Sequence, residues 1–191
     1  KSLERLTKGT ADESSPSWSP DGTRIAFMSN RQPDADRHPI SQVFVVDARP
    51  GSTETALTPI ESRGGRSEPE WSPDGKWIAF LEGDERKFAS YGMSHLTLVS
   101  TDGTGKPMRV RATEALDRGV SSPKFSSDGR WITAFVTEDR SVYPIRVAAT
   151  GSGSAQRLVD PPTTMSSWTS AGECSAVLSS SQSRPREIYR A

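Results

Sequence analysis

The chain has 191 residues, the length of one domain or of one array of repeats. Its 24 basic and 24 acidic residues balance, which argues against a general nucleic-acid-binding or membrane-surface role, since both need a basic excess. The single cysteine, Cys174, excludes an internal disulfide and leaves the cellular compartment open. No apolar run reaches the roughly 18 residues of a membrane span. Together with the balanced charge, this means that neither nucleic acid nor a membrane is expected as a partner.

One segment recurs along the chain at nearly constant spacing. The first copy reads Pro-Ser-Trp-Ser-Pro-Asp-Gly-Thr-Arg-Ile-Ala-Phe over 16–27, and the second reads Pro-Glu-Trp-Ser-Pro-Asp-Gly-Lys-Trp-Ile-Ala-Phe over 69–80. A weaker third copy covers 123–135, and an eroded fourth covers 166–177. Their aligned aromatic residues, spaced 53, 54 and 43 residues apart, are Trp18, Trp71, Phe125 and Trp168. A fixed period in this range indicates a repeat fold, with the aromatic residues packing between repeats.

The centre of each copy predicts a tight hairpin turn. In Ser19-Pro20-Asp21-Gly22, proline presets φ, aspartate favours the next turn position, and glycine accepts the positive φ that closes the hairpin. This role explains the aspartates better than a catalytic site in a central channel would. The turn pairs are Asp21 and Gly22, Asp74 and Gly75, and Asp128 and Gly129.

The chain predicts four antiparallel strands per repeat. The first strand ends at the aromatic residue and the second follows the turn. The third strands are expected at 42–47, 94–99 and 142–147, and the shorter fourth strands at 56–58, 108–110 and 156–159. Because the 14 prolines and 15 glycines fall between the apolar runs, a helical fold is disfavoured. The prediction is an all-β chain, a β-propeller with about four blades of four antiparallel strands.

The chain is predicted to be a single β-propeller domain over 1–191, with blades at about 8–58, 59–110, 111–159 and 160–191. Residues 3–7 resemble a fourth strand, whereas the last copy ends after its third. Two completions stay open: residues 3–7 complete the last blade and close a ring of four, or the missing strands belong to sequence outside this chain. Cys174 falls in a predicted strand and is expected to be a buried, inert thiol.

The sequence matches no known motif for catalysis, metal binding or cofactor binding. The Gly-x-Ser-x-Gly nucleophile elbow does not occur, and Gly92-Met93-Ser94-His95 lacks its second glycine. Neither His38 nor His95 has metal-ligand spacing to a partner. We therefore expect no catalytic residue, no metal and no cofactor in this chain.

The loops that join second to third strands, and those that join blades, are expected to share one face of the propeller. They carry many charges, and elaborated loops on a rigid scaffold are where binding usually occurs. One interpretation is that this face contacts substrate or docks a partner domain; the other is that these are ordinary solvated loops. The candidate residues are Arg31, Arg37, Arg63, Arg66, Asp117, Arg118, Glu138, Asp139 and Arg140.

The repeated Trp-Ser-Pro-Asp-Gly followed by Ile-Ala-Phe resembles the propeller repeat shared by TolB and the prolyl oligopeptidase family of serine peptidases. The segments 115–120, 137–140 and 183–190 favour the acylaminoacyl-peptidase and dipeptidyl-peptidase-like members. In those peptidases, a Pro-x-Glu-Ile-Tyr segment like 185–189 ends the last propeller strand before the hydrolase domain.

The resemblance implies a noncatalytic propeller that caps an α/β-hydrolase domain of the same parent protein and admits peptides by size. The catalytic residues of the family lie in that hydrolase domain, so none is transferred to this chain. Family propellers usually have seven or eight blades, which implies that this chain is a fragment. Such a fragment is expected to associate with itself through open edges. The alternative is a TolB-like stand-alone scaffold for protein–protein interaction.

Overall fold

The computed structural model describes residues 3–37, 40–60, 66–84, 92–102, 107–160, 164–171, 174–181 and 183–191. These residues form an all-β fold whose one helical element is the 3-10 turn η1 (Ala35–Arg37). Within this part of the chain, no helix has the length and apolarity to span a membrane. The strands are β1 (Glu13–Trp18), β2 (Arg24–Ser29), β3 (Gln42–Asp47), β4 (Thr55–Ala56), β5 (Arg66–Trp71), β6 (Trp77–Glu82), β7 (His95–Ser100), β8 (Arg109–Arg111), β9 (Val120–Phe125), β10 (Trp131–Glu138), β11 (Ser141–Ala148), β12 (Gln156–Arg157), β13 (Thr164–Ala171), β14 (Cys174–Ser181) and β15 (Arg184–Arg190).

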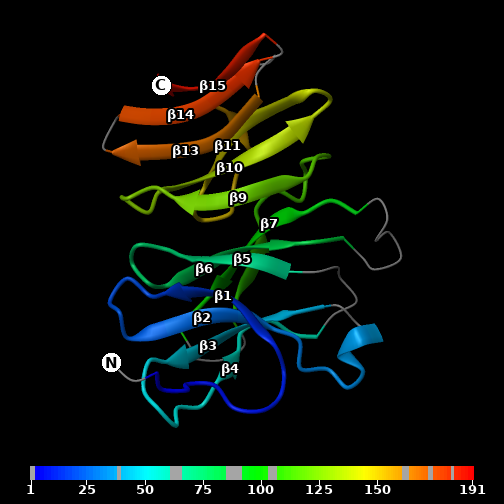
Figure 1. Ribbon diagram of the computed structural model, residues 1–191, viewed down its shortest axis with the longest axis vertical. Helices are drawn as coiled ribbons and strands as arrows, with labels where there is room; N and C mark the ends of the chain where they lie inside the picture. Colours follow the sequence, from blue (N-terminus) through cyan, green and yellow to red (C-terminus); the bar gives the residue numbers. More distant parts are fainter. Residues whose placement is uncertain are drawn as a thin grey trace.

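The strands form successive antiparallel sheets stacked along the long axis of the molecule (Figure 1). The first sheet has the order β1-β2-β3-β4 and the second the order β5-β6-β7-β8. We call β9–β12 the third sheet and β13–β15 the fourth sheet, although one parallel bridge between Val142 and Thr164 links them. The predicted all-β architecture of short antiparallel meanders is confirmed.

The first repeat turn is closed by hydrogen bonds between residues close in sequence. Ser19 Oγ donates to Asp21 Oδ1 at 2.6 Å and accepts the Arg24 N–H at 2.9 Å. Asp21 Oδ1 also accepts the Thr23 N–H at 3.1 Å. Gly22 has φ +68°, a left-handed conformation that costs glycine little. The turn aspartate therefore organises the hairpin, as the sequence predicts.

The second and third turns repeat this arrangement. Ser72 donates to Asp74, and Ser126 donates to Asp128, each at 2.6 Å. The glycines that follow these aspartates also have φ +68°. The geometry is thus a property of the Ser-x-Asp-Gly segment and not of one location in the fold.

The repeat aromatic of the second sheet fastens it to the first. Trp71 is 6% exposed, and its indole N–H donates to the Ser17 carbonyl at 3.0 Å. The Arg24 guanidinium lies 4.8 Å from the centre of the Trp71 ring, a cation–π contact worth about 0.5–2 kcal/mol depending on its exposure. The predicted packing role is confirmed for this residue. The core around Trp71 contains Ala26, Met28, Val43, Val45 and Leu57 from one side and Ile78, Phe80 and Val99 from the other.

Successive turns also stack on each other. A Cβ built at Gly75 would lie 3.8 Å from Pro20 Cδ, and one at Gly129 would lie 3.6 Å from Pro73 Cδ. The proline of each turn therefore packs over the glycine of the next. This stacking adds contacts between sheets at the end of the molecule where the hairpins turn.

The structure differs from the sequence prediction at both ends of the chain. Residues 3–7 form no strand; they lie beside the first sheet, and the fourth sheet lies at the opposite end of the molecule (Figure 1). Closure of a four-blade ring within one chain is therefore not seen. Trp18 is 59% exposed because, among the residues that the structure describes, no sheet packs against it. Cys174 does begin a strand, but the prediction that it is buried is wrong, because in the described part of the chain no layer covers its side of the fourth sheet.

Replacing Gly75 by alanine should lower the free energy of unfolding by about 1–2 kcal/mol, because a non-glycine residue is strained at φ +68°. Urea denaturation followed by circular dichroism measures this. Gly119→Ala is the matched control, since Gly119 is outside the positive-φ region and its Cβ would make an ordinary 3.7 Å contact with Ser94 N. Equal destabilisation by both substitutions would contradict this account of the turn.

The turn aspartates should make the fold sensitive to acid. The Ser19 hydroxyl, followed by the Thr23 N–H, lowers the pKa of Asp21 to about 2, and the equivalent serine bonds lower the pKa values of Asp74 and Asp128. A lowered folded-state pKa stabilises the fold fully above the ordinary value of 3.8 and loses that effect as pH falls toward about 2. The melting temperature should drop across this window, and drop less in Ser19→Ala. An identical drop in the variant would show that Asp21 is not responsible.

Candidate functional site

The candidate site is the loop face, which we define as the ends of the second strands, the starts of the third strands and the connections between sheets. Its described residues are 30–37, 40–41, 57–60, 83–84, 92–94, 112–119, 138–140 and 158–160. Charged side chains at this face are organised sheet by sheet.

On the first sheet, Arg31 turns back over the strands. Its guanidinium lies 4.3 Å from the Phe44 ring centre and 5.7 Å from that of Phe27. It donates to Glu13 at 3.0 Å and also bonds Glu54, which lowers the pKa of the Glu54 carboxyl. Arg31 therefore covers the first sheet and does not project from the loop face.

On the second sheet, a carboxylate is buried among arginines. Glu82 ends β6 and is 0% exposed. Arg109 Nη1 lies 3.7 Å and Arg111 Nε 3.6 Å from its carboxylate oxygens. A buried charge of this kind persists only with opposite charges around it, so removing either arginine would leave Glu82 in an unfavourable environment.

Arg111 also lies near a second acidic group, Asp84, and so connects it to Glu82. Asp84 accepts the Met93 N–H at 2.9 Å and lies 3.2 Å from His95 Nε2 and 3.5 Å from Arg111 Nη2. The Met93 N–H contributes most to lowering the pKa of Asp84, followed by the charges of His95 and Arg111. The other His95 nitrogen, Nδ1, is 3.0 Å from the Thr113 carbonyl, so both ring nitrogens are engaged.

On the third sheet, Glu138 is the centre of a more exposed cluster. Tyr143 donates to Glu138 Oε2 at 2.8 Å, Arg157 lies 3.0 Å from the same oxygen, and Arg118 lies 3.3 Å from Oε1. The Tyr143 hydroxyl lowers the pKa of Glu138 most, with Arg118 and Arg157 contributing further. Arg157 also donates to the Tyr143 oxygen at 2.8 Å, and this bond raises the pKa of Arg157.

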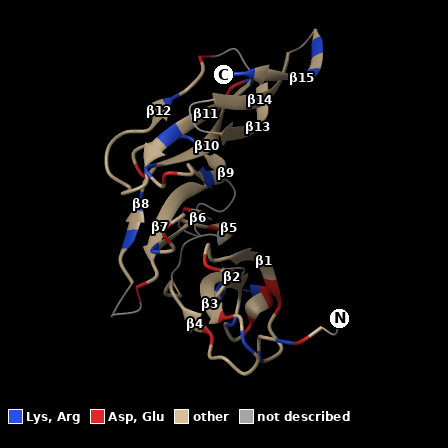
Figure 2. Ribbon diagram, turned by 90° about the vertical axis from the view of Figure 1, so that its left-hand side faces the viewer, with Lys and Arg blue, Asp and Glu red and all other residues tan. Residues whose placement is uncertain are grey.

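The two clusters are joined through the backbone. The Val120 N–H donates to the Ser94 carbonyl at 2.8 Å, which places the start of β9 against the start of β7. Basic and acidic residues both occur in the region of β7–β11 (Figure 2). The outer members stay accessible, since the Asp117 side chain is 88% exposed and that of Arg118 is 44% exposed. The arrangement offers solvent both signs of charge on a rigid support.

The structure brings together some of the predicted site residues and places others elsewhere. Asp117, Arg118 and Glu138 share the third-sheet cluster. Asp139, at φ 49°, and Arg140 form a two-residue turn between β10 and β11, shorter than the loop expected from the other repeats. Arg37 lies in η1. Arg63 and the Arg66 side chain lie outside the described residues, although Arg66 begins β5.

Sequence analysis missed the core of the second-sheet cluster, which consists of Glu82, Asp84, His95, Arg109 and Arg111. One available signal was a glutamate at the end of an otherwise apolar strand, 78–82. Another was the pair of arginines at alternate positions, 109 and 111, which share one side of a strand. Among the described residues, no group of three histidine, cysteine, aspartate or glutamate side chains could hold a metal ion.

No protein-family model matches this chain. Curated relatives that match it in sequence include two proteins named as peptidases. The uncharacterized peptidase YuxL of Bacillus subtilis is 30% identical over 122 residues, and dipeptidyl-peptidase 5 of Trichophyton schoenleinii is 33% identical over 134 residues. The matches cover 64% and 63% of this chain, which spans 17% of the length of each relative.

Solved structures show the same fold at low sequence identity. The β-propeller domain of the trilobed protease from Pyrococcus furiosus superposes with a TM-score of 0.62 and 18% identity, covering 93% of this chain and 51% of that one. The acylaminoacyl peptidase of Pyrococcus horikoshii gives 0.64 and 19%, with coverages of 93% and 25%. TolB from Acinetobacter baumannii gives 0.63 and 18%, with coverages of 94% and 41%.

These findings confirm the β-propeller fold and the resemblance that the repeats predict. The chain is similar in sequence to an uncharacterized peptidase and to dipeptidyl-peptidase 5, and similar in fold to the β-propeller domain of a protease, to an acylaminoacyl peptidase and to TolB.

Proposed function

We propose that this chain is a noncatalytic propeller domain of a serine peptidase of the prolyl oligopeptidase family. Its loop face docks an α/β-hydrolase domain of the same parent protein and admits peptides to it. The observation that carries this proposal is the joined pair of charged clusters on the second and third sheets. The third-sheet cluster holds exposed acidic and basic groups, Asp117 and Arg118, at the face where loops are elaborated.

The comparisons favour a peptidase over a TolB-like scaffold. The sequence matches, at 30–33% identity over nearly two thirds of this chain, are with proteins named as peptidases. TolB is similar at 18% identity, a level at which the likeness concerns fold alone. The stand-alone interaction scaffold is therefore the second candidate.

The exposed cluster is suited to reversible docking. Arg118 is paired with Glu138 at 3.3 Å in a solvated position, and such pairs contribute about 0–1 kcal/mol. Arg118 can therefore leave Glu138 and pair with a carboxylate of a partner at little cost in free energy. The buried group around Glu82 is different, because its charges are held inside the sheet and keep the platform rigid.

The same groups suit the charged ends of a peptide. A guanidinium such as that of Arg118 binds a terminal carboxylate through charge-assisted hydrogen bonds. The carboxylates of Asp117 and Glu138 suit a terminal ammonium group. In this proposal, the loop face selects short peptides because their termini lie close enough together to reach groups of both signs.

Charge reversal at the loop face should weaken docking. We expect Arg118→Glu combined with Arg140→Glu to reduce binding of the separately produced hydrolase domain of the Bacillus subtilis relative by roughly 10-fold, or about 1.4 kcal/mol. Calorimetric titration at two salt concentrations measures this, and wild-type binding should weaken as salt rises. Arg49→Glu, on the opposite face, is the control. Undiminished binding by the double variant would remove the loop face as the docking surface, and absence of binding by the wild type would favour the scaffold.

The purified chain should not hydrolyse chromogenic peptide substrates, because the proposal assigns the nucleophile to the hydrolase domain. The assay compares the chain with buffer over prolonged incubation. Steady product release that follows the protein through a final chromatographic step would overturn the noncatalytic assignment.

A further inference from the structure

A hollow of about 540 Å³ lies between the outer edges of the first and second sheets. β4 and β8, the outer strands of these sheets, lie along the same edge of the stack (Figure 2). The described residues that line the hollow include Ala56, Leu57 and Pro59 from the first sheet and Pro107 and Arg109 from the second. Two sheets that share one core thus leave room between them at this edge.

The other side of β8 is closed by the third sheet. A Cβ built at Gly151, in the turn after β11, would lie 2.6 Å from Val110 Cγ1 and 3.3 Å from Leu98 Cδ1. Contacts this short leave no room for even one added methyl group. Of the two sides of β8, the one that faces the first sheet is therefore the side on which another molecule can place side chains.

The hollow combines one positive charge with apolar surroundings. Arg109 is the one charged residue among the described residues that line it. Ile60 and Met108 directly follow Pro59 and Pro107 in the sequence, and each is 56% exposed. Exposed apolar side chains gathered around a hollow commonly mark a binding site. An occupant of this hollow should therefore carry apolar side chains and a negative charge.

Arg109 can bind a further carboxylate without leaving Glu82. Arg109 Nη1 lies 3.7 Å from the buried Glu82 carboxylate, and the Arg109 side chain is 21% exposed. One guanidinium has five N–H donors in a fixed fork, so it can serve several carboxylates. Arg111 shows this in the same cluster, since separate nitrogens of its guanidinium face Glu82 at 3.6 Å, Asp84 at 3.5 Å and Glu114 at 2.6 Å.

Two buried polar atoms lie on the same side of the second sheet as Arg109. Thr97 Oγ1 and Arg111 Nε have no hydrogen-bond partner within the described part of the chain. Thr97 lies directly opposite Arg111 across the β7–β8 pair, and residues 109 and 111 share one side because side chains alternate along a strand. Buried polar atoms are normally hydrogen-bonded, so a polar group that enters beside Arg109 would find partners here.

The edge of β8 offers backbone groups to an extended chain. The Ala112 N–H donates to the Leu96 carbonyl at 2.8 Å, so the backbone groups of Ala112 and, by alternation, of Val110 point toward β7. The N–H and C=O groups of Arg109 and Arg111 therefore point away from β7. β8 is the outermost strand of its sheet among the described residues. A peptide in extended conformation can pair with such an edge as an added strand.

We infer that this hollow binds an extended segment of a partner protein that carries an acidic side chain, with apolar side chains two residues before and two residues after it. The segment pairs with β8, and its carboxylate lies against Arg109. The spacing follows because alternate side chains of the added strand share the side that faces the hollow, where Leu57 and Pro59 form an apolar wall. This site goes beyond the proposed function, and its test needs no hydrolase domain.

Fluorescence anisotropy of the intact chain with a fluorescein-labelled, amide-capped peptide Gly-Gly-Leu-Thr-Glu-Thr-Leu tests the inference, and saturable binding is expected. The peptide with glutamine in place of glutamate should bind at least ~10-fold more weakly, because it loses the ion pair with Arg109. Gly-Gly-Thr-Leu-Glu-Leu-Thr has the same composition but places both leucines on the closed side of β8, so it should also bind at least ~10-fold more weakly. Equal binding of either control peptide overturns the inference.

Two neighbouring substitutions test the location. Ala56 lines the hollow and is exposed, so Ala56→Glu adds a carboxylate there without disturbing the core. This change should weaken binding of the leucine–glutamate–leucine peptide at least ~10-fold, because the new carboxylate repels the peptide and competes for Arg109. Thr55→Glu is the matched control, since Thr55 is exposed in the same strand but does not line the hollow, and it should bind like the wild type.

Circular dichroism melting checks that both variants are folded. Unchanged binding by Ala56→Glu, or equal weakening by both variants, removes the hollow as the site. A wild-type chain that binds none of the peptides overturns the inference. So does a hollow occupied by a second copy of the chain, which sedimentation equilibrium would reveal as a dimer that Ala56→Glu dissociates.

Discussion

The second sheet of this protein has apolar side chains on both faces, and packing them against the neighbouring sheets stabilises the fold. The junction around Trp71 shows how the repeat meets this requirement. An indole, a guanidinium above it and a hydrogen bond to the preceding sheet's backbone hold two sheets in one orientation. Because the same segment recurs, a sheet can pack its aromatic residue on the sheet before it and can offer a packing surface to the aromatic residue of the sheet after it. The stacking of successive sheets derives from this asymmetry.

The charged residues of the loop face have two different physical roles. Glu82 is fully buried, so removing one of its arginine partners is expected to destabilise the fold strongly. Glu138 and Arg118 are solvated, and their pairing is weak enough to be exchanged for groups on another molecule. A rigid inner cluster beside an exchangeable outer one is a suitable basis for a surface that docks a domain and meets peptides.

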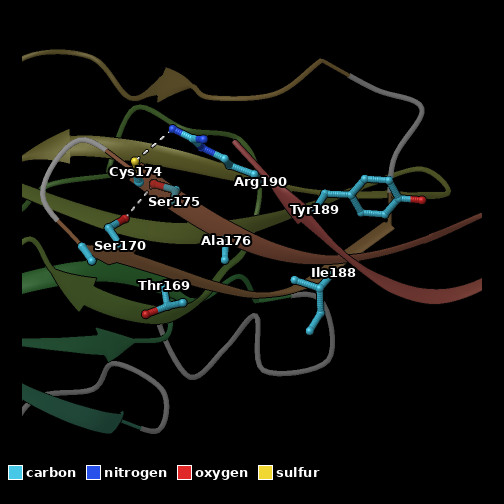
Figure 3. A pocket seen from close by; sticks show the side chains of 9 residues that line it. Thr169, Ser170, Cys174, Ser175, Ala176, Ile188, Tyr189 and Arg190 are labelled. Atoms are coloured by element: carbon cyan, nitrogen blue, oxygen red, sulfur yellow. Dashed lines mark hydrogen bonds between the residues drawn. The ribbon is translucent and has the colours of Figure 1, made fainter.

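Erosion of the fourth repeat has a structural consequence. Trp18 pairs with a residue seven positions later, Ile25, whereas Trp168 pairs with one nine positions later, Val177. Without a Ser-Pro-Asp-Gly turn, β13 and β14 continue to Ala171 and Cys174, and the hairpin is longer. On the outer face of the fourth sheet, Ala176 lies opposite Arg190 and lines a hollow (Figure 3). A weak repeat copy therefore differs from the others in the geometry of its surface, and this is where a specific contact can arise.

The sequence alone determined the features that depend on neighbours within a few residues. The Ser19–Asp21 bond, the positive φ of Gly22 and the strands that end at Trp18, Trp71 and Phe125 follow from local chemistry, so the all-β repeat fold could be predicted. Tertiary structure decided which charges are neutralised and which aromatics are buried. Glu82 lies near Arg109 and Arg111 only when β8 pairs with its sheet. Arg31 does not project from the loop face because its guanidinium packs over the Phe44 ring. Trp18 and Trp71 occupy the same local sequence context, yet one is exposed and the other buried, because burial depends on whether another sheet stands beside them.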